Sequence, residues 1–251
     1  MAIFVVGTSG ATGRLLVEQL LSRGESVKVI VRSPDRLPEA LKNNDHLSVI
    51  RASLLDLNDD EIGRHVKGCA AVASCLGHNL SWKGIYGYPR RLVTDATRRL
   101  CNAIKANKAE EPTKFVLMNT AGNGNRDIHE PISFGQECLI GFVRLLLPPH
   151  VDNEKAADYL RTDIGQEDKA IQWAVVRPDT LINESRVKEY EVYPSPTRSA
   201  IFNPGSTSRI NVAHFMADLI TNQDTWNRWK GQMPVIYNQA ERGGSRTELR
   251  T

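Results

Sequence analysis

The sequence predicts an α/β fold built on a doubly wound, mostly parallel sheet in a single domain. Short apolar runs alternate with amphipathic helical segments over most of the chain, and the first apolar run leads directly into a glycine-rich turn. Strands separated by helices pair in parallel through right-handed crossovers, so helices cover both faces of the sheet. A length of 251 residues fits one such domain.

Short apolar runs predict the strands, and apolar residues spaced three and four apart predict the helices. The first helix has Leu15, Leu16 and Leu20 on one face and stops at Gly24. The predicted strands are residues 2–6, 26–31, 47–50, 70–75, 114–118 and 171–176. The predicted helices are residues 12–23, 58–67 and 93–107.

Three long insertions follow the fourth, fifth and sixth predicted strands, at residues 78–92, 123–155 and 180–211. Insertions at the carboxyl ends of parallel strands are typical of substrate-binding loops. The second contains an apolar piece, Cys138–Leu147, which Pro148 and Pro149 are expected to stop. This piece is either a lid or wall over a substrate, or a dimer face or further core helix.

Composition and charge narrow the function classes. Hydrophobic residues make up 41% of the chain, and the formal net charge of +3 arises from mixed charges, which argues against a nucleic-acid partner. No run approaches the ~20 apolar residues of a membrane span, and the N-terminus has no basic leader. We therefore expect a cytoplasmic protein, monomer or homodimer, without a membrane partner.

The four cysteines show no CxxC spacing, so they predict buried thiols in a reducing compartment and no metal site. Residues 1–238 are expected to form the domain. Residues 239–251 are polar and predict a disordered tail or a non-native remnant.

The glycine-rich turn has the spacing GxxGxxG, follows a predicted strand and opens a predicted helix. Glycines allow the backbone to approach a pyrophosphate, and the free N–H groups of the helix N-terminus favour its negative charge. The alternative is an ordinary tight turn, with the hydroxyls as helix caps. The residues expected to bind the dinucleotide here are Gly7, Thr8, Ser9, Gly10, Ala11, Thr12 and Gly13.

The second predicted strand is followed by Arg32, at a position where NAD-binding proteins usually place an acidic residue for the ribose hydroxyls. A guanidinium at this position can stack on adenine and pair with a 2′-phosphate. Ser33 and Arg36 are placed to assist it. The alternative is that both arginines are solvated loop residues. This charge pattern favours NADP over NAD.

These motifs, with Cys75-Leu76-Gly77, Val175-Val176-Arg177-Pro178 and the segment 208–220, resemble the atypical short-chain dehydrogenase/reductases. The NmrA-like and flavin/biliverdin-reductase-like branch is the most similar, over residues 1–238. The resemblance implies a Rossmann-like fold in which Cys75, Leu76 and Gly77 line the cofactor and Pro178 flanks the nicotinamide. It places Ser53 and Leu54 beside the adenine, where many relatives have Asp. Asn119 and Thr120 would stand at the position of the active-site serine.

Many relatives also use a Tyr and a Lys four residues later as a proton-donating pair. Here Lys155 is preceded at that spacing by Val151, and Asn153 by Pro149, so neither register restores the pair. Tyr159 follows Lys155 in the reverse order and is expected to pack in the helix.

The catalytic candidates that remain are Thr120 and Asn119, which can polarise a carbonyl, and His150, which can give a proton near neutral pH. Lys155 can bind the nicotinamide ribose. Each has a structural alternative, such as hydrogen bonding at a strand end. Trp82, Tyr86 and Tyr88 can stack on a planar substrate or merely anchor their loop.

We therefore expect an NADPH-dependent oxidoreductase that transfers hydride to a small planar or carbonyl-containing acceptor such as a flavin, quinone or enone. The alternatives are an NADP(H)-binding sensor or interaction protein without turnover, and an isomerase or epimerase that retains NADP.

Overall fold

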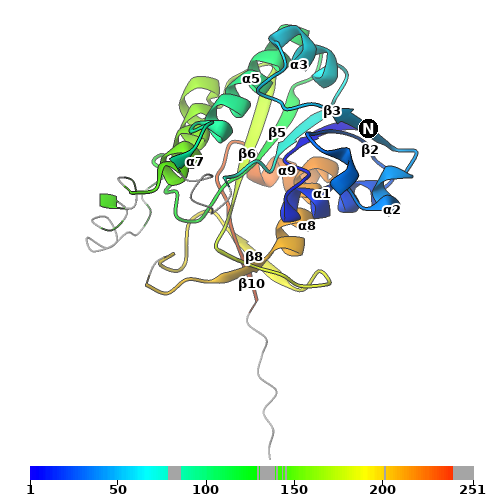
Figure 1. The fold of residues 1–251 in the computed structure, drawn as a ribbon. Coiled ribbons are helices and arrows are strands. Elements are labelled where there is room, and N and C mark those ends of the chain that lie inside the picture. Colours follow the sequence, from blue (N-terminus) through cyan, green and yellow to red (C-terminus); the bar gives the residue numbers. More distant parts are fainter. Residues whose placement is uncertain are drawn as a thin grey trace, which may run out of the picture.

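One sheet of eight strands runs through the part of the chain that the computed structural model describes, which is residues 1–78, 86–128, 130, 139, 141–142, 144, 146–200 and 202–239. Its strands are β1 (Ala2–Val6), β2 (Ser26–Val31), β3 (Leu47–Arg51), β4 (Ala71–Ser74), β5 (Thr113–Met118), β6 (Ile171–Pro178), β8 (Tyr190–Tyr193) and β10 (Val235–Asn238). The order across the sheet is β3-β2-β1-β4-β5-β6-β10-β8 (Figure 1).

The sheet is parallel except at its last pair, β10 and β8. Its first six strands wind outward in both directions from β1 and β4, which makes the gap above these two strands the switch point of a doubly wound sheet. The predicted fold class is therefore confirmed. Ligands of such sheets bind outside the carboxyl ends of the strands, at the switch point.

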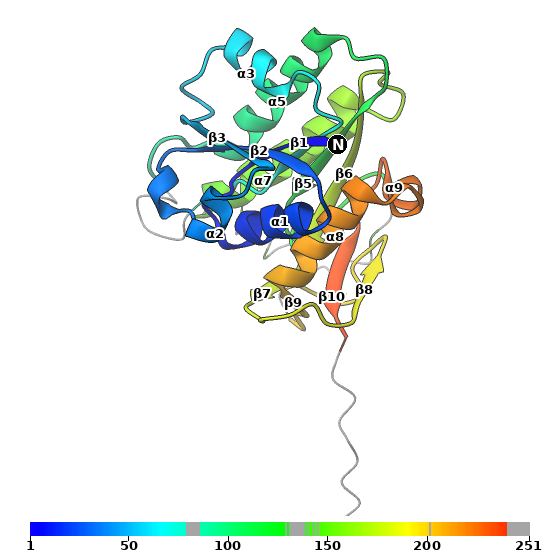
Figure 2. The ribbon, with the colours of Figure 1, turned by 90° about the vertical axis from the view of Figure 1, so that its right-hand side faces the viewer.

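Helices cover both faces of the sheet (Figures 1 and 2). One layer holds α3 (Asp59–Val66), α5 (Leu92–Asn107) and α7 (Pro148–Asp158). The other holds α1 (Ala11–Ser22), α8 (Arg209–Thr221) and α9 (Gln223–Trp229). The short α2 (Glu39–Lys42) lies between β2 and β3, and a small parallel pair, β7 (Thr180–Ile182) and β9 (Ser206–Ser208), lies below α8.

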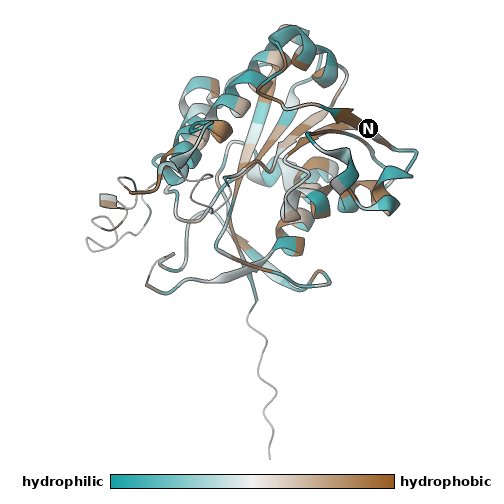
Figure 3. Cartoon of the chain, viewed as in Figure 1, coloured by the Kyte–Doolittle hydropathy of each residue, from teal (hydrophilic) through white to brown (hydrophobic). Residues whose placement is uncertain are grey.

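The sheet divides the hydrophobic core into two clusters, because alternate residues of a strand face opposite sides. In β1, Phe4 and Val6 belong to the cluster under α3, α5 and α7, whereas Ile3 and Val5 belong to the cluster under α1, α8 and α9. All four side chains are fully buried. Apolar residues accordingly concentrate on the central strands and on the inner faces of the helices (Figure 3).

Most predicted elements lie within two residues of the observed ones. The helix expected at 58–67 is α3, whose N-terminus is fixed by a capping box between Asn58 and Glu61. The structure adds α7, α8, α9 and the strands β7 to β10, which the sequence pattern did not predict as elements. The insertion at 180–211 thus supplies β7, β8 and β9.

Pro148 and Pro149 end the apolar piece, as predicted, because Leu147 before them lies outside any helix. The same two prolines also begin α7, at its first two positions. Proline is tolerated there because the first N–H groups of a helix have no partner within it.

Of the other predictions, Trp82, much of the apolar piece Cys138–Leu147 and the tail from residue 240 lie outside the described residues.

Candidate functional site

The glycine turn lies at the switch point and is pressed against the end of β4. Gly7 has a φ of +85°, and a Cβ on it would lie 2.5 Å from the carbonyl carbon and oxygen of Cys75. A Cβ on Gly13 would overlap the carbonyl oxygen of Gly7. Only glycine fits these two positions, so the turn keeps its backbone bare beside β4.

The N-terminus of α1 faces this turn without a cap. Its N-cap residue is Gly10, no side chain among the described residues accepts a hydrogen bond from its first turn, and no acidic residue lies in that turn. Thr8 is 1% exposed, and its Oγ1 has no hydrogen-bond partner in the described residues. Free N–H groups and a buried hydroxyl suit an anion such as a pyrophosphate. Thr12 is buried and Ser9 and Ala11 are exposed beside them.

A cation stands at the neighbouring strand end. Arg32 directly follows β2, is exposed, and forms no ion pair with any residue that the structure describes. Ser33 is also exposed and precedes a 3₁₀ turn at Pro34–Arg36. The side chain of Arg36 lies outside the described part of the structure. Because β1 and β2 are parallel neighbours, Arg32 and the glycine turn share one edge of the sheet.

The residues expected around the adenosine half follow β3 and β4. Leu54 is buried, its carbonyl accepts a hydrogen bond from Arg99, and Ser53 is half-buried beside it. Leu76 packs against the core, whereas Gly77 is exposed with open space around it. Burial raises the pKa of the Cys75 thiol to about 12, which makes this thiol a packing group at neutral pH.

At the end of β5, Asn119 connects the sheet to α7. Its Nδ2 donates to the carbonyl of Asn153 at 2.8 Å, and its Oδ1 accepts from the backbone N–H of Thr120 at 2.9 Å. Both ends of the amide are therefore used. Thr120 is half-buried, and its Oγ1 accepts a bond from the N–H of Gly122 at 3.3 Å. The structural alternative for Asn119 thus has direct support.

Two more candidates lie on α7. His150 Nε2 is 3.4 Å from Oε1 of Glu154, one turn further along, in ion-pair geometry. Arg144 grips the same carboxylate with three N–H···O contacts of 2.8–3.0 Å. Burial would raise the pKa of Glu154, but His150 and Arg144 outweigh it and lower the pKa to about 2. Lys155 is exposed and forms no ion pair within the described residues.

His150 also lies close to the loop that follows β5. A Cβ placed on Gly122 would lie 3.5 Å from Cε1 of His150 and 3.8 Å from Oγ1 of Thr120. The fold therefore brings His150 and Thr120, predicted separately, to the same side of the sheet edge. Glu154 was missed, although its spacing of four from His150 is visible in the sequence.

A second buried pair, His78 and Asp152, was also missed. His78 follows the end of β4, and its Nε2 is 2.8 Å from Oδ2 of Asp152 on α7. The same carboxylate accepts the backbone N–H groups of Val93 and Thr94, in the first turn of α5. No sequence signal links these residues, because the contacts join three separate elements.

At the end of β6, Pro178 and Asp179 make contacts that stabilise the fold. Pro178 is buried and pairs with Ile236 of β10. Asp179 accepts a hydrogen bond from the N–H of Gly205. Among the aromatic candidates, Tyr86 donates to the carbonyl of Leu146 at 3.0 Å, which favours loop anchoring, and Tyr88 is 96% exposed.

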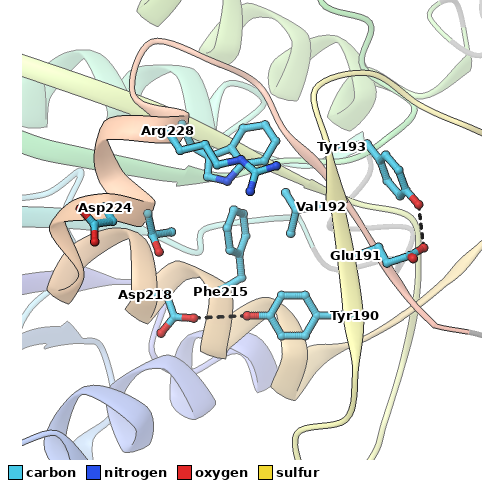
Figure 4. Close-up of a pocket in the computed structure, with 10 residues that line it drawn as sticks. Tyr190, Glu191, Val192, Tyr193, Phe215, Asp218, Asp224 and Arg228 are labelled. Carbon is cyan, nitrogen blue, oxygen red and sulfur yellow. Dashed lines mark hydrogen bonds between the residues drawn. The ribbon is translucent and has the colours of Figure 1, made fainter.

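A separate hollow of about 560 Å³ lies between β8, α8 and α9 (Figure 4). Tyr190 and Val192 line it from the face of β8 turned toward the helices, and the Tyr190 hydroxyl donates a hydrogen bond to Asp218. The side chain of Arg228 stacks on the Trp229 ring at 5.0 Å. None of the residues predicted for the site lines this hollow.

In the part of the chain that the structure describes, no helix has the length and apolar character needed to cross a membrane.

Several proteins of known sequence or structure are similar to this chain. An uncharacterized chloroplastic protein of Arabidopsis thaliana is 25% identical over 226 residues, which cover 89% of this chain and 73% of that protein. A wide-type short-chain dehydrogenase/reductase from Veillonella parvula, solved in complex with NADP, has a TM-score of 0.68 at 15% identity, with 95% of each chain covered.

A putative NADH-flavin reductase from Streptococcus pneumoniae has a TM-score of 0.65 at 18% identity, covering 95% of this chain and 100% of that one. A putative NAD-dependent epimerase/dehydratase from Bacillus halodurans has a TM-score of 0.66 at 20% identity, covering 95% and 94%. At these identities the likeness shows the shared fold and no single reaction.

A family model described as NAD(P)H-binding matches residues 7–223, from the first glycine of the turn to the start of α9. The matched span begins directly after β1 and includes the glycine turn and the strands β2 to β6. The chain belongs to the NAD(P)H-binding family.

Proposed function

We propose that this protein is an NADPH-dependent reductase of a small planar or carbonyl-containing acceptor. The observation that supports it most is the pairing of a bare glycine turn at the switch point with an exposed, unpaired Arg32 one strand away in the described structure. The turn suits a pyrophosphate, and the arginine suits the 2′-phosphate that distinguishes NADP from NAD.

The residues fit such a cofactor in three respects. Glycine at positions 7 and 13 leaves the backbone open, the first turn of α1 has no cap, and Oγ1 of Thr8 is buried without a partner among the described residues. Gly7, Gly10, Ala11, Thr12 and Gly13 would hold the pyrophosphate, and Arg32 with Ser33 the adenosine phosphate. A bound reduced nicotinamide would supply hydride to the acceptor.

The chain's own residues would bind and orient the reactants. Asn119 and the buried Asp152 fix α7 against β5 and α5, so the groups on α7 keep a set distance from the strand ends. A conjugated acceptor spreads the incoming charge, so it suits a site without a tyrosine and lysine pair at the usual spacing.

Calorimetric titration of the full chain with NADPH and NADH tests the cofactor. We expect NADPH to bind at least tenfold more tightly, and Arg32→Ala to remove this preference while NADH binding stays unchanged. A charge-assisted hydrogen bond lost from the 2′-phosphate corresponds to about 1.5–3 kcal/mol, or roughly 10- to 150-fold. Arg64→Ala, an exposed arginine on α3, is the control of equal charge.

Turnover is tested by following NADPH oxidation with a panel of flavins, quinones and enones. Oxidation of NADPH with at least one acceptor is the expected result. Tight binding without turnover of any acceptor, combined with unequal affinities for NADP and NADPH, would instead favour a redox sensor.

A further inference from the structure

We infer that His150 is the proton donor of this site and that the carboxylate of Glu154 positions its ring. The inference rests on the proposed function, because it assigns a role in the reduction proposed above. The observation behind it is that His150 faces the buried carboxylate of Glu154 beside the loop that follows β5.

The position of His150 agrees with the half of the site where chemistry would occur. A dinucleotide spans the switch point, and its adenosine half lies toward the end of β2, which Arg32 follows. The nicotinamide half then extends over the ends of β5 and β6. His150 lies at this end, since its Cε1 and the Oγ1 of Thr120 both come within 4 Å of a Cβ built on Gly122.

The ring of His150 is buried at one nitrogen, and another part of the side chain is exposed. Nε2 is covered by the protein and faces Oε1 of Glu154 at 3.4 Å, while 13% of the side chain remains exposed. Glu154 is itself 5% exposed and locked by Arg144. The buried nitrogen thus meets a fixed negative charge, which leaves Nδ1 as the nitrogen that can reach an acceptor.

The surrounding charges favour this role. Glu154 is the charged group in contact with the ring, and Arg144 partly balances it from outside. Asp152, two residues from His150 on the same helix, forms its own pair with His78, which follows β4. The loop after β5 contributes Thr120 and Gly122, which are neutral. Asn119 is less suited, because both ends of its amide are occupied.

The proton transfer balances in atoms and electrons. The N–H bond at Nδ1 of His150 breaks, its electron pair stays on the ring, and a new O–H or N–H bond forms on the acceptor atom that has gained charge from the hydride. The acceptor gains two electrons and two hydrogens in total. Neutral His150 then takes a proton from water, and Glu154 stabilises the positive ring again.

Chemical modification of the wild-type chain tests the placement without using activity. Diethyl pyrocarbonate carbethoxylates histidine rings, and peptide mass spectrometry separates the six histidines. We expect saturating NADP to slow modification of His150 at least fivefold, whereas 2′,5′-ADP, which has the same adenosine phosphate but no nicotinamide, leaves it unchanged. His46 is exposed after α2 and should react equally in all samples.

Substitution tests the role. His150→Gln should lower kcat at least 100-fold with the affinity for NADPH unchanged within twofold, because general acids contribute about 10²- to 10⁴-fold. His46→Gln is the control. Glu154→Gln should lower kcat less than His150→Gln does, with the affinity for NADPH unchanged within twofold, since the ring loses the carboxylate that it faces. A purely structural Glu154 would lower the free energy of unfolding and leave kcat unchanged.

Equal protection by NADP and 2′,5′-ADP, no protection by bound NADP, or full kcat in His150→Gln would each overturn the inference while the proposed function stands. If calorimetry finds no binding of either coenzyme, the proposed function fails and the inference fails with it.

Discussion

Asp152 of α7 and His78 in the segment after β4 form a buried pair, with 2.8 Å between Oδ2 and Nε2. The same carboxylate accepts the N–H groups of Val93 and Thr94, so it caps α5 from a different helix. A carboxylate at a helix N-terminus is also favoured by the helix dipole. One side chain therefore fixes the end of β4, the start of α5 and the middle of α7 against one another.

Replacing this residue by Asp152→Asn should destabilise the protein by about 1.5–3 kcal/mol, the typical contribution of hydrogen bonds to a charged group. Asparagine keeps one acceptor oxygen, but its NH₂ group then faces a backbone N–H or the His78 ring in place of the second oxygen. Urea denaturation at pH 7 measures the change. Asp45→Asn, at an exposed position, is the control and should change stability by less than ~0.5 kcal/mol.

The same residue predicts a pH effect. Burial would raise the pKa of Asp152, but hydrogen bonds from His78, Thr94 and Val93 outweigh it and lower the pKa. A carboxyl whose pKa is lower in the folded state stabilises the protein at pH values above its pKa in the unfolded state, about 3.9. This contribution is lost as the pH falls through the lower pKa of the folded state. Stability between pH 5 and pH 3 should therefore fall less steeply in Asp152→Asn than in the wild type. Parallel curves would contradict this account.

Gly13→Ala should weaken cofactor binding by more than tenfold and also lower stability. The new Cβ would overlap the carbonyl oxygen of Gly7 and lie 2.8 Å from its carbon, and backbone cannot move aside as a flexible side chain does. Calorimetry with NADPH and urea denaturation measure the two effects. Gly63→Ala in α3 meets nothing within 4 Å and should be neutral or stabilising by up to ~1 kcal/mol. Unchanged NADPH binding in Gly13→Ala would count against the proposed cofactor turn.

The turn and the first strands were predictable because their signals are local. Gly7 and Gly13 stand in a short motif between an apolar run and a helical pattern, and each strand from β1 to β6 is rich in apolar residues. By contrast β8 and β10 are four residues each and pair with each other only through the folded sheet. The His78–Asp152 pair spans 74 positions, so only the packing of α7 reveals it.

Cys75 should be nearly inert to alkylation in the folded protein. Burial raises the pKa of its thiol to about 12 from the ordinary value of 9.0. Because only the thiolate reacts, labelling by iodoacetamide at pH 8 should be on the order of 1000-fold slower than for an ordinary exposed thiol. Peptide mass spectrometry after timed labelling measures the rate, with protein in denaturant as the control. Labelling of Cys75 at the same rate in both samples would refute the burial argument.

Arg177 is a fully buried cation at the end of β6, and Glu130 is its counter-charge at 2.7 Å. Its guanidinium also donates to the carbonyls of Met233, Asn123 and Pro194, so it joins β6, the start of β10 and two loops. Arg177→Met should destabilise the protein by about 3–5 kcal/mol, because the Glu130 carboxylate would remain buried without a partner.

A double-mutant cycle separates the ion pair from the packing. Adding Glu130→Gln to Arg177→Met removes the stranded charge, so the double variant should be more stable than the sum of the two single losses by at least ~1 kcal/mol. Arg14→Met is the exposed control, since its pair with Glu18 at 3.7 Å is solvated and contributes less than about 1 kcal/mol. Additive losses in the cycle would mean that the bonds from Arg177 to the three carbonyls, and not its pairing with Glu130, hold the loop after β5 against β6.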